Sequence, residues 1–159
     1  MTTASERLAK LGLTLPAVAA PVAAYIPAVR AGDYIYTSGQ LPFVDGKLQG
    51  TGKVGDSVTV QEAAGYARTA ALNALAAAAE VAGSLDAIAR IIKVTCFVAS
   101  EPAFTEQAKV ANGASEFFIE VLGHAGRHAR SAVGMAVLPL DSPVEVEVIV
   151  EVAAAGESS

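Results

Sequence analysis

The most constraining feature of this sequence is the nine-residue run Val144–Val152, in which every even position is valine. The odd positions hold Glu145, Glu147, Ile149 and Glu151. A period of two is typical of a β-strand, because successive side chains of a strand point to opposite faces of the sheet. The run therefore predicts a strand with one buried valine face and one face that carries carboxylates.

A long helix is expected to begin at Thr59. Thr59 and Glu62 have the spacing of a capping box, in which the hydroxyl accepts from the N3 amide and the carboxylate reaches back to the cap amide. Apolar residues then recur at helical spacing as far as Ala82, and Gly83 is the expected end of the helix. Most of these residues are alanine, so the pattern predicts a helix that approaches a sheet closely.

The remaining pattern predicts an α+β domain with the element order ββαβαββ. A short helix is expected at residues 5–11, and a second long helix from about 102 to 122. Runs rich in β-branched residues predict further strands at 24–29, 34–38, 89–98 and 131–138. The last of these is expected to form a hairpin with Val144–Val152. We therefore expect one mixed sheet with two helices on one face.

The composition excludes several classes of protein. Of the 159 residues, 53% are hydrophobic and 17% are charged, which excludes intrinsic disorder. The net charge of −5 disfavours nucleic-acid binding, because such binding rests on clustered cations. No run reaches the ~18–20 apolar residues of a membrane span, and the first ten residues lack the apolar block of a signal peptide. We expect a cytoplasmic protein with neither a nucleic-acid nor a membrane partner.

The core of a single copy is expected to be thin. Alanine dominates the sequence, tryptophan is absent and aromatic residues make up only 6%. The mean hydropathy is nevertheless +0.45. Apolar residues that a thin core cannot bury are often covered by other subunits, so the composition indicates self-association.

Three motifs have mainly structural interpretations. The run Gly50–Gly55 matches GxGxxG, but no buried strand precedes it, so it is interpreted as a glycine-rich loop rather than a dinucleotide site. His124 and His128 are interpreted as surface loop residues rather than metal ligands, and His128 is the one that could border a binding site. Cys96 is the only cysteine, and its strand position predicts a buried, inert thiol.

The charged residues of the last third leave alternatives open. The three glutamates of Val144–Val152 form either a solvated sheet face or a face in which one carboxylate is held in a cleft beside a cation. Arg130 forms either an ordinary ion pair or a guanidinium fork that is directed at an anionic ligand. Spacing alone does not decide between these interpretations.

Several motifs together resemble the Rid family of reactive-intermediate (2-iminoacid) deaminases, also called YjgF-like or L-PSP proteins. Residues 130–133 (Arg-Ser-Ala-Val), followed by Leu138-Pro139 and residues 144–147, resemble the C-terminal signature of this family. Residues 37–40 (Thr-Ser-Gly-Gln) resemble the motif of its second strand. The resemblance extends from about Pro21 to Val152. We therefore expect an N-terminal extension with a short helix at residues 1–20, a Rid-like domain at 21–153 and a flexible tail at 154–159.

This resemblance implies a chorismate-mutase-like subunit that assembles as a homotrimer, with cofactor-free and metal-free sites in the clefts between subunits. The glutamate that positions water falls on Glu147. The residues that bind the substrate fall on Arg130, Tyr25, Ser38, Gly39 and Asn112. The implied partner is a small ligand with a carboxylate, which the arginine would hold.

The implied activity is hydrolysis of 2-imino or enamine acids to 2-oxo acids and ammonia. Ala132 stands where the best-known deaminases have cysteine, so the chain is interpreted as a diverged branch. A non-catalytic trimeric module that binds a small carboxylate is the alternative function. RNA cleavage, a third activity associated with the family, is disfavoured by the net charge of −5.

Overall fold

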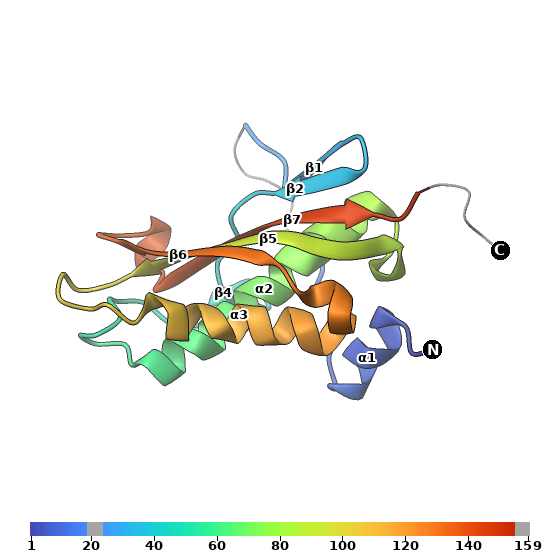
Figure 1. Cartoon of the computed structure of the whole chain (residues 1–159). Helices are drawn as coiled ribbons and strands as arrows, with labels where there is room; N and C mark the ends of the chain where they lie inside the picture. Colours follow the sequence, from blue (N-terminus) through green and yellow to red (C-terminus); the bar gives the residue numbers. More distant parts are fainter. Residues whose placement is uncertain (19–23, 155–159) are drawn as a thin grey trace.

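The computed structural model describes residues 1–18 and 24–154, which form one mixed sheet with two long helices on one face (Figure 1). The helices are α1 (Ala4–Lys10), α2 (Val60–Ala82) and α3 (Gln107–Leu122). The main sheet has the order β1-β2-β7-β5-β6, with β1 Ala28–Ala31, β2 Tyr34–Thr37, β5 Ile88–Ala99, β6 Ala129–Met135 and β7 Val144–Val152. A separate ribbon pairs β3 (Phe43–Val44) with β4 (Lys47–Leu48). The predicted α+β fold is confirmed.

The expected C-terminal hairpin is wrong, because β6 and β7 are not neighbours. β6 pairs in parallel with β5, whereas β7 lies between β2 and β5 and is antiparallel to both. Met135 ends β6 beside Ala99, and Val144 begins β7 beside Val98, so residues 136–143 cross the end of β5. Proline, aspartate and serine in this segment suit a crossing loop as well as a tight turn.

The termini of α2 are close to the prediction. Thr59 Oγ1 accepts from the Glu62 amide at 3.2 Å, and Gly83 ends the helix in the left-handed region with φ of 99°. The carboxylate of Glu62 accepts from the hydroxyl of Thr59 at 3.0 Å instead of reaching the cap amide.

Three elements have wrong predicted boundaries. The strand expected at residues 131–138 is β6, Ala129–Met135, so it begins two residues earlier and ends three residues earlier. The first strand begins at Ala28 rather than at residue 24, directly after Pro27, which has no N–H to donate to a ladder. The second long helix begins at Gln107, because the Glu101 amide bonds to the Val54 carbonyl in a loop that precedes it.

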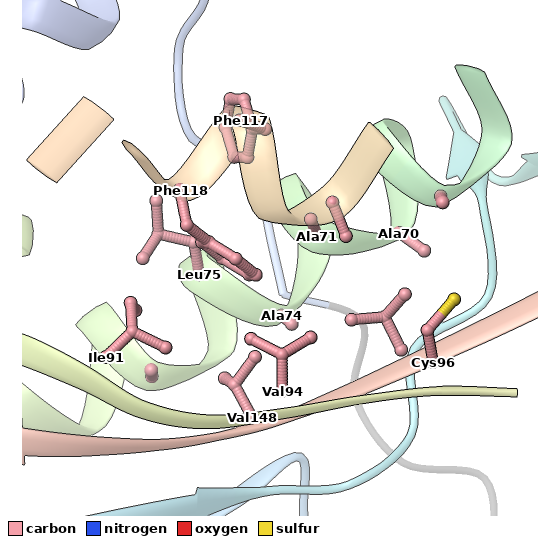
Figure 2. Close-up of a cluster of buried hydrophobic side chains, with 14 of the residues drawn as sticks. Ala70, Ala71, Ala74, Leu75, Ile91, Val94, Cys96, Phe117, Phe118 and Val148 are labelled. Atoms are coloured by element: carbon pink, nitrogen blue, oxygen red, sulfur yellow. The ribbon is translucent and has the colours of Figure 1, made fainter. Parts of the chain in front are cut away.

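The core lies between the helices and the valine face of the sheet (Figure 2). Alanines of α2 allow the close approach, and the larger side chains come from α3 and the strands. The fully buried members include Ala70, Ala71, Ala74, Leu75, Val94, Cys96, Phe117 and Phe118. Burial raises the pKa of the Cys96 thiol to about 12, so the predicted inert thiol is confirmed.

The other side of the sheet, which we call the open face, is not covered by the helices (Figure 1). The valines of β7 are buried, and the residues between them are partly exposed, as the alternation predicts. Tyr34 and Tyr36 of β2 and Val133 and Met135 of β6 also lie on this face, each between 37% and 43% exposed. The described chain therefore leaves an apolar sheet surface exposed.

The N-terminal segment packs on the domain. The Ser5 amide donates to the Asp86 carboxylate at 2.9 Å, and the Arg7 guanidinium donates to the Val121 carbonyl at 3.2 Å, near the end of α3. The expected boundary at residues 20 and 21, and nearly all of the expected tail, lie outside the described residues. Among the described residues, no helix combines the length and hydropathy needed to cross a bilayer.

Candidate functional site

Arg130 lies at the sheet edge formed by β6, on the side of the sheet that faces α3. Its partner in the ladder is Val94, which is fully buried under the helices. The guanidinium Nη1 donates to Asn112 Oδ1 at 2.7 Å and to Ser115 Oγ at 3.2 Å, both on α3. No hydrogen bond from Arg130 Nε or Nη2 is formed within residues 1–18 and 24–154. The edge of the guanidinium that binds a carboxylate side-on is therefore unoccupied by the described chain.

His128 and Ser115 extend this group. His128 Nε2 lies 2.8 Å from Ser115 Oγ, and its Nδ1 lies 2.6 Å from the Gly126 carbonyl oxygen. Burial lowers the pKa of His128, the bond to Gly126 acts in the opposite direction, and the positive charge of Arg130 lowers it further. The interpretation as a surface histidine holds for exposed His124 and is wrong for half-buried His128.

A second group of site residues lies where β2 ends. The Ser38 hydroxyl donates to the Ile26 carbonyl at 2.7 Å, which attaches the segment containing exposed Tyr25 to the end of β2. Gly39 approaches the carboxylate of Glu145 so closely that a methyl group on Gly39 would overlap it. Any side chain at position 39 would therefore displace the carboxylate of Glu145 from its present place.

Glu145 and Glu147 lie two residues apart on the open face of β7. Burial raises the pKa of Glu145, and the negative charge of Glu147 raises it further. Glu147 lines a hollow of about 110 Å³ together with Tyr36, Lys93 and Thr95. The predicted acidic face is therefore partly sheltered rather than fully solvated.

The structure brings Arg130 and Asn112 together but separates them from the acidic residues. β5 lies between β6 and β7, so the two strands are about 9–10 Å apart. Arg130 faces the helices, whereas Glu147, which pairs with Thr95, lies on the open face. Within one chain, a small ligand held by Arg130 does not reach Glu145 or Glu147.

Sequence reasoning did not assign roles to Ser115 and Glu145. Ser115 follows Asn112 by three positions, and that spacing on a helix was a signal that both share one face. Glu145 had the same alternation as Glu147, so only the contact with Gly39, which the fold creates, distinguishes it.

Residues 5–152 match the family described as "YjgF/chorismate_mutase-like, putative endoribonuclease". The chain belongs to this YjgF/chorismate mutase-like family. It is 45% identical to protein TCP17 of Trypanosoma cruzi over 148 residues, which are 92% of each protein. This finding confirms the resemblance at the level of the YjgF/L-PSP family, and assignment to the Rid branch stays a prediction.

Two solved structures show the same fold. The crystal structure of Atu1372 from Agrobacterium tumefaciens, a protein of unknown function, matches with a TM-score of 0.86 and 48% identity, covering 94% of this chain and 92% of that one. TdcF of E. coli, crystallised with bound serine, matches with a TM-score of 0.59 and 29% identity, covering 84% and 91%.

Proposed function

We propose that this protein hydrolyses 2-imino or enamine acids to 2-oxo acids and ammonia, at sites formed between the subunits of a homotrimer. The observation that carries the proposal is Arg130, whose Nη1 is held by Asn112 and Ser115. Its Nε and Nη2 form no hydrogen bond with the described part of the chain, and these two groups have the geometry that binds a carboxylate with two parallel bonds. A 2-imino acid carries such a carboxylate next to its reacting carbon.

The separation of Arg130 from the acidic residues supports a site between subunits. A second copy that places its open face against the β6 edge would bring its glutamates to Arg130. The apolar residues of the open face, such as Tyr36 and Val133, provide surface that such packing would bury. We expect sedimentation at micromolar concentration to give about three times the subunit mass of 16.1 kDa.

Hydrolysis of the C=N bond requires a substrate bound in a fixed orientation and a residue that transfers protons. Arg130 fixes the carboxylate and thereby the C=N carbon, which reduces the entropic cost of reaching the reactive geometry. A glutamate takes a proton from water as its oxygen adds to this carbon. The glutamate returns this proton to the nitrogen, which gives a carbinolamine. The added hydroxyl group then transfers its own proton to the nitrogen by way of the glutamate, the C=O bond forms as the C–N bond breaks, and ammonia departs from the 2-oxo acid.

We propose that Glu145 is the proton-transferring residue and that Glu147, the residue implied by the resemblance, adjusts it. A general base works best with a pKa near the working pH, and both burial and the charge of Glu147 raise the pKa of Glu145. Glu145 also lies directly beside Gly39, another residue of the implied site.

A trimeric module that binds a small carboxylate without catalysis is the second candidate. The bound serine in TdcF favours it, because serine is a small carboxylate ligand. Ala132, which packs against the core, offers no thiol at the position where the best-known deaminases have cysteine. The family description also names an endoribonuclease, but the net charge of −5 disfavours that activity here.

The test measures ammonia and 2-oxo acid release from freshly generated 2-imino acids. We expect the wild type to accelerate release above buffer, and Arg130→Ala to lose about 10²-fold or more of that acceleration because the substrate is no longer oriented. Arg127→Ala removes an exposed arginine three residues away and is the matched control, with wild-type rates expected. Binding of pyruvate without any acceleration by the wild type would favour the module instead.

A further inference from the structure

A chain of hydrogen bonds runs from Arg130 through Ser115 to His128, a residue that has no assigned role. Arg130 Nη1 donates to Ser115 Oγ at 3.2 Å, and Ser115 Oγ lies 2.8 Å from His128 Nε2. His128 Nδ1 lies 2.6 Å from the Gly126 carbonyl oxygen. Ser115 comes from α3 and His128 from the segment that leads into β6, so the chain spans the junction between them.

The two ends of this chain determine the direction of every bond. A carbonyl oxygen only accepts, so Nδ1 of His128 carries the proton, and Nε2 of the neutral ring is an acceptor. The Ser115 hydroxyl must then donate to Nε2, which leaves its lone pairs for the N–H of Arg130. Ser115 and the neutral His128 each accept one bond and donate another, an order in which neighbouring bonds strengthen one another.

The surroundings of His128 favour the neutral ring that this order requires. Burial and the charge of Arg130 lower the pKa of the imidazole, against the opposite effect of Gly126. The Phe118 ring packs edge-on to the imidazole, with ring centroids 6.0 Å apart. This packing restrains the plane of the ring and keeps Nε2 directed at Ser115.

We propose that His128, acting through Ser115, is a positioning residue that holds the Arg130 guanidinium ready for side-on binding of a ligand carboxylate. The proposal rests on the role of Arg130 in the proposed function. Asn112 provides one acceptor for Nη1 and Ser115 the second, and two acceptors together restrain rotation of the guanidinium. A restrained guanidinium loses less freedom when a ligand binds, so affinity is higher.

The first experiment observes the ¹⁵N signals of the Arg130 guanidinium with no ligand present. The wild type is expected to show slow rotation about Nε–Cζ and therefore separate Nη signals. Ser115→Ala and His128→Phe are expected to speed this rotation and merge the signals. His128→Gln keeps an acceptor near the position of Nε2 and should retain separate signals. Ser115→Ala is compatible with the helix, because alanine is the best helix former.

The second experiment measures the affinity for pyruvate, a small 2-oxo acid of the proposed product class. Ser115→Ala and His128→Phe are expected to weaken binding about fivefold to tenfold, the value of one hydrogen bond. His128→Gln should restore most of the affinity. His124→Phe changes the exposed histidine of the same segment and is the matched control, with wild-type affinity expected.

Three results would overturn the positioning role. Separate Nη signals in both Ser115→Ala and His128→Phe would exclude restraint through these residues. Wild-type affinity for pyruvate in both variants would do the same. Covalent labelling of Ser115 by a fluorophosphonate would identify the pair as nucleophile and base instead. If the wild type neither binds pyruvate nor accelerates ammonia release, the proposed function fails, and the signals of Arg130 still decide on positioning.

Discussion

At the β6 edge, Arg130 is held by two residues of α3, whereas on the open face Glu145 and Glu147 lie near each other on β7. Neither of these carboxylates forms an ion pair within residues 1–18 and 24–154. The cationic group is therefore oriented by its own chain. The pKa of Glu145 is raised first by burial and further by the negative charge of Glu147.

In the proposed intersubunit site, this difference corresponds to two half-sites, one with Arg130 and one with the glutamates. Like charges that share a partly buried surface are stabilised when a cation or a proton arrives. Arg130 of a second copy would supply the positive charge. The nitrogen of its bound substrate would accept the proton. The following predictions test this division from the largest expected effect to the smallest.

Replacing Glu145 should have the largest effect. Glu145→Gln keeps the shape but removes the base, so we expect hydrolysis of 2-imino acids to fall by about 10²–10⁴-fold while pyruvate binding is kept or improved. Glu147→Gln should reduce the rate less, because it only removes a charge beside the base. Glu151→Gln, on the same face but paired with Arg90, is the control. If Glu147→Gln loses more of the hydrolysis rate than Glu145→Gln, Glu147 is the general base instead.

Mixed trimers test whether the half-sites come from different copies. Arg130→Ala and Glu145→Gln chains are each expected to be nearly inactive alone. When the two are unfolded together and refolded in equal amounts, about a quarter of the sites should combine an intact arginine with an intact glutamate. We expect about a quarter of the wild-type rate, measured as ammonia release. A mixture as inactive as its parents would place both groups in one chain.

Replacing Glu145 should also change how the free energy of unfolding depends on pH, and this effect is expected to be smaller. The pKa of Glu145 is raised in the folded chain, so its stabilising contribution is full below the unfolded pKa and is lost as pH rises through the folded one. Glu145→Gln should therefore be more stable than the wild type near pH 7–8, and the gain should vanish near about pH 4.

Urea denaturation at the two pH values measures this difference. The paired Glu151 supplies the control variant Glu151→Gln, which should show no such gain. Equal stability of Glu145→Gln and the wild type at both pH values would contradict an unfavourable charge at Glu145.

Arg68 shows how an arginine behaves when its own chain supplies the carboxylate. Its Nη1 and Nη2 donate to the two oxygens of Glu120 at 3.2 and 2.9 Å, which lowers the pKa of Glu120. The pair is partly exposed, so Arg68→Ala should cost at most about 1 kcal/mol of unfolding free energy. Pyruvate affinity should not change, as isothermal titration would show. A loss of affinity would mean that Arg130 is not the only carboxylate anchor.

Local patterns in the sequence predicted the elements well. The alternation in Val144–Val152 predicted both faces of β7, and the Thr59 cap and Gly83 bounded α2 correctly. These features depend on neighbours in the chain, so the sequence contains them directly. The pairing of β6 was predicted wrongly, because turn-forming residues in 136–143 are compatible with a hairpin and with a crossing over β5.

The family resemblance predicted which residues belong to the candidate site. The structure showed which of them lie close together. Asn112 and Arg130 are 18 positions apart and meet because α3 packs beside β6. Ser115 and His128 needed the same packing to form a pair. Glu145 and Glu147 share one sequence pattern, and the contact of Glu145 with Gly39 arises only in the fold.

The sequence by itself determined that this chain forms an alternating strand with a valine face and an alanine-rich helix to cover it, because periodicity and capping act between residues that are near in sequence. Only the tertiary structure decided that β5 separates β6 from β7 and that Arg130 and the glutamates face opposite sides of the sheet. Strand order and side-chain proximity are set by packing across the whole molecule, where burial of the core outweighs any local preference for a hairpin.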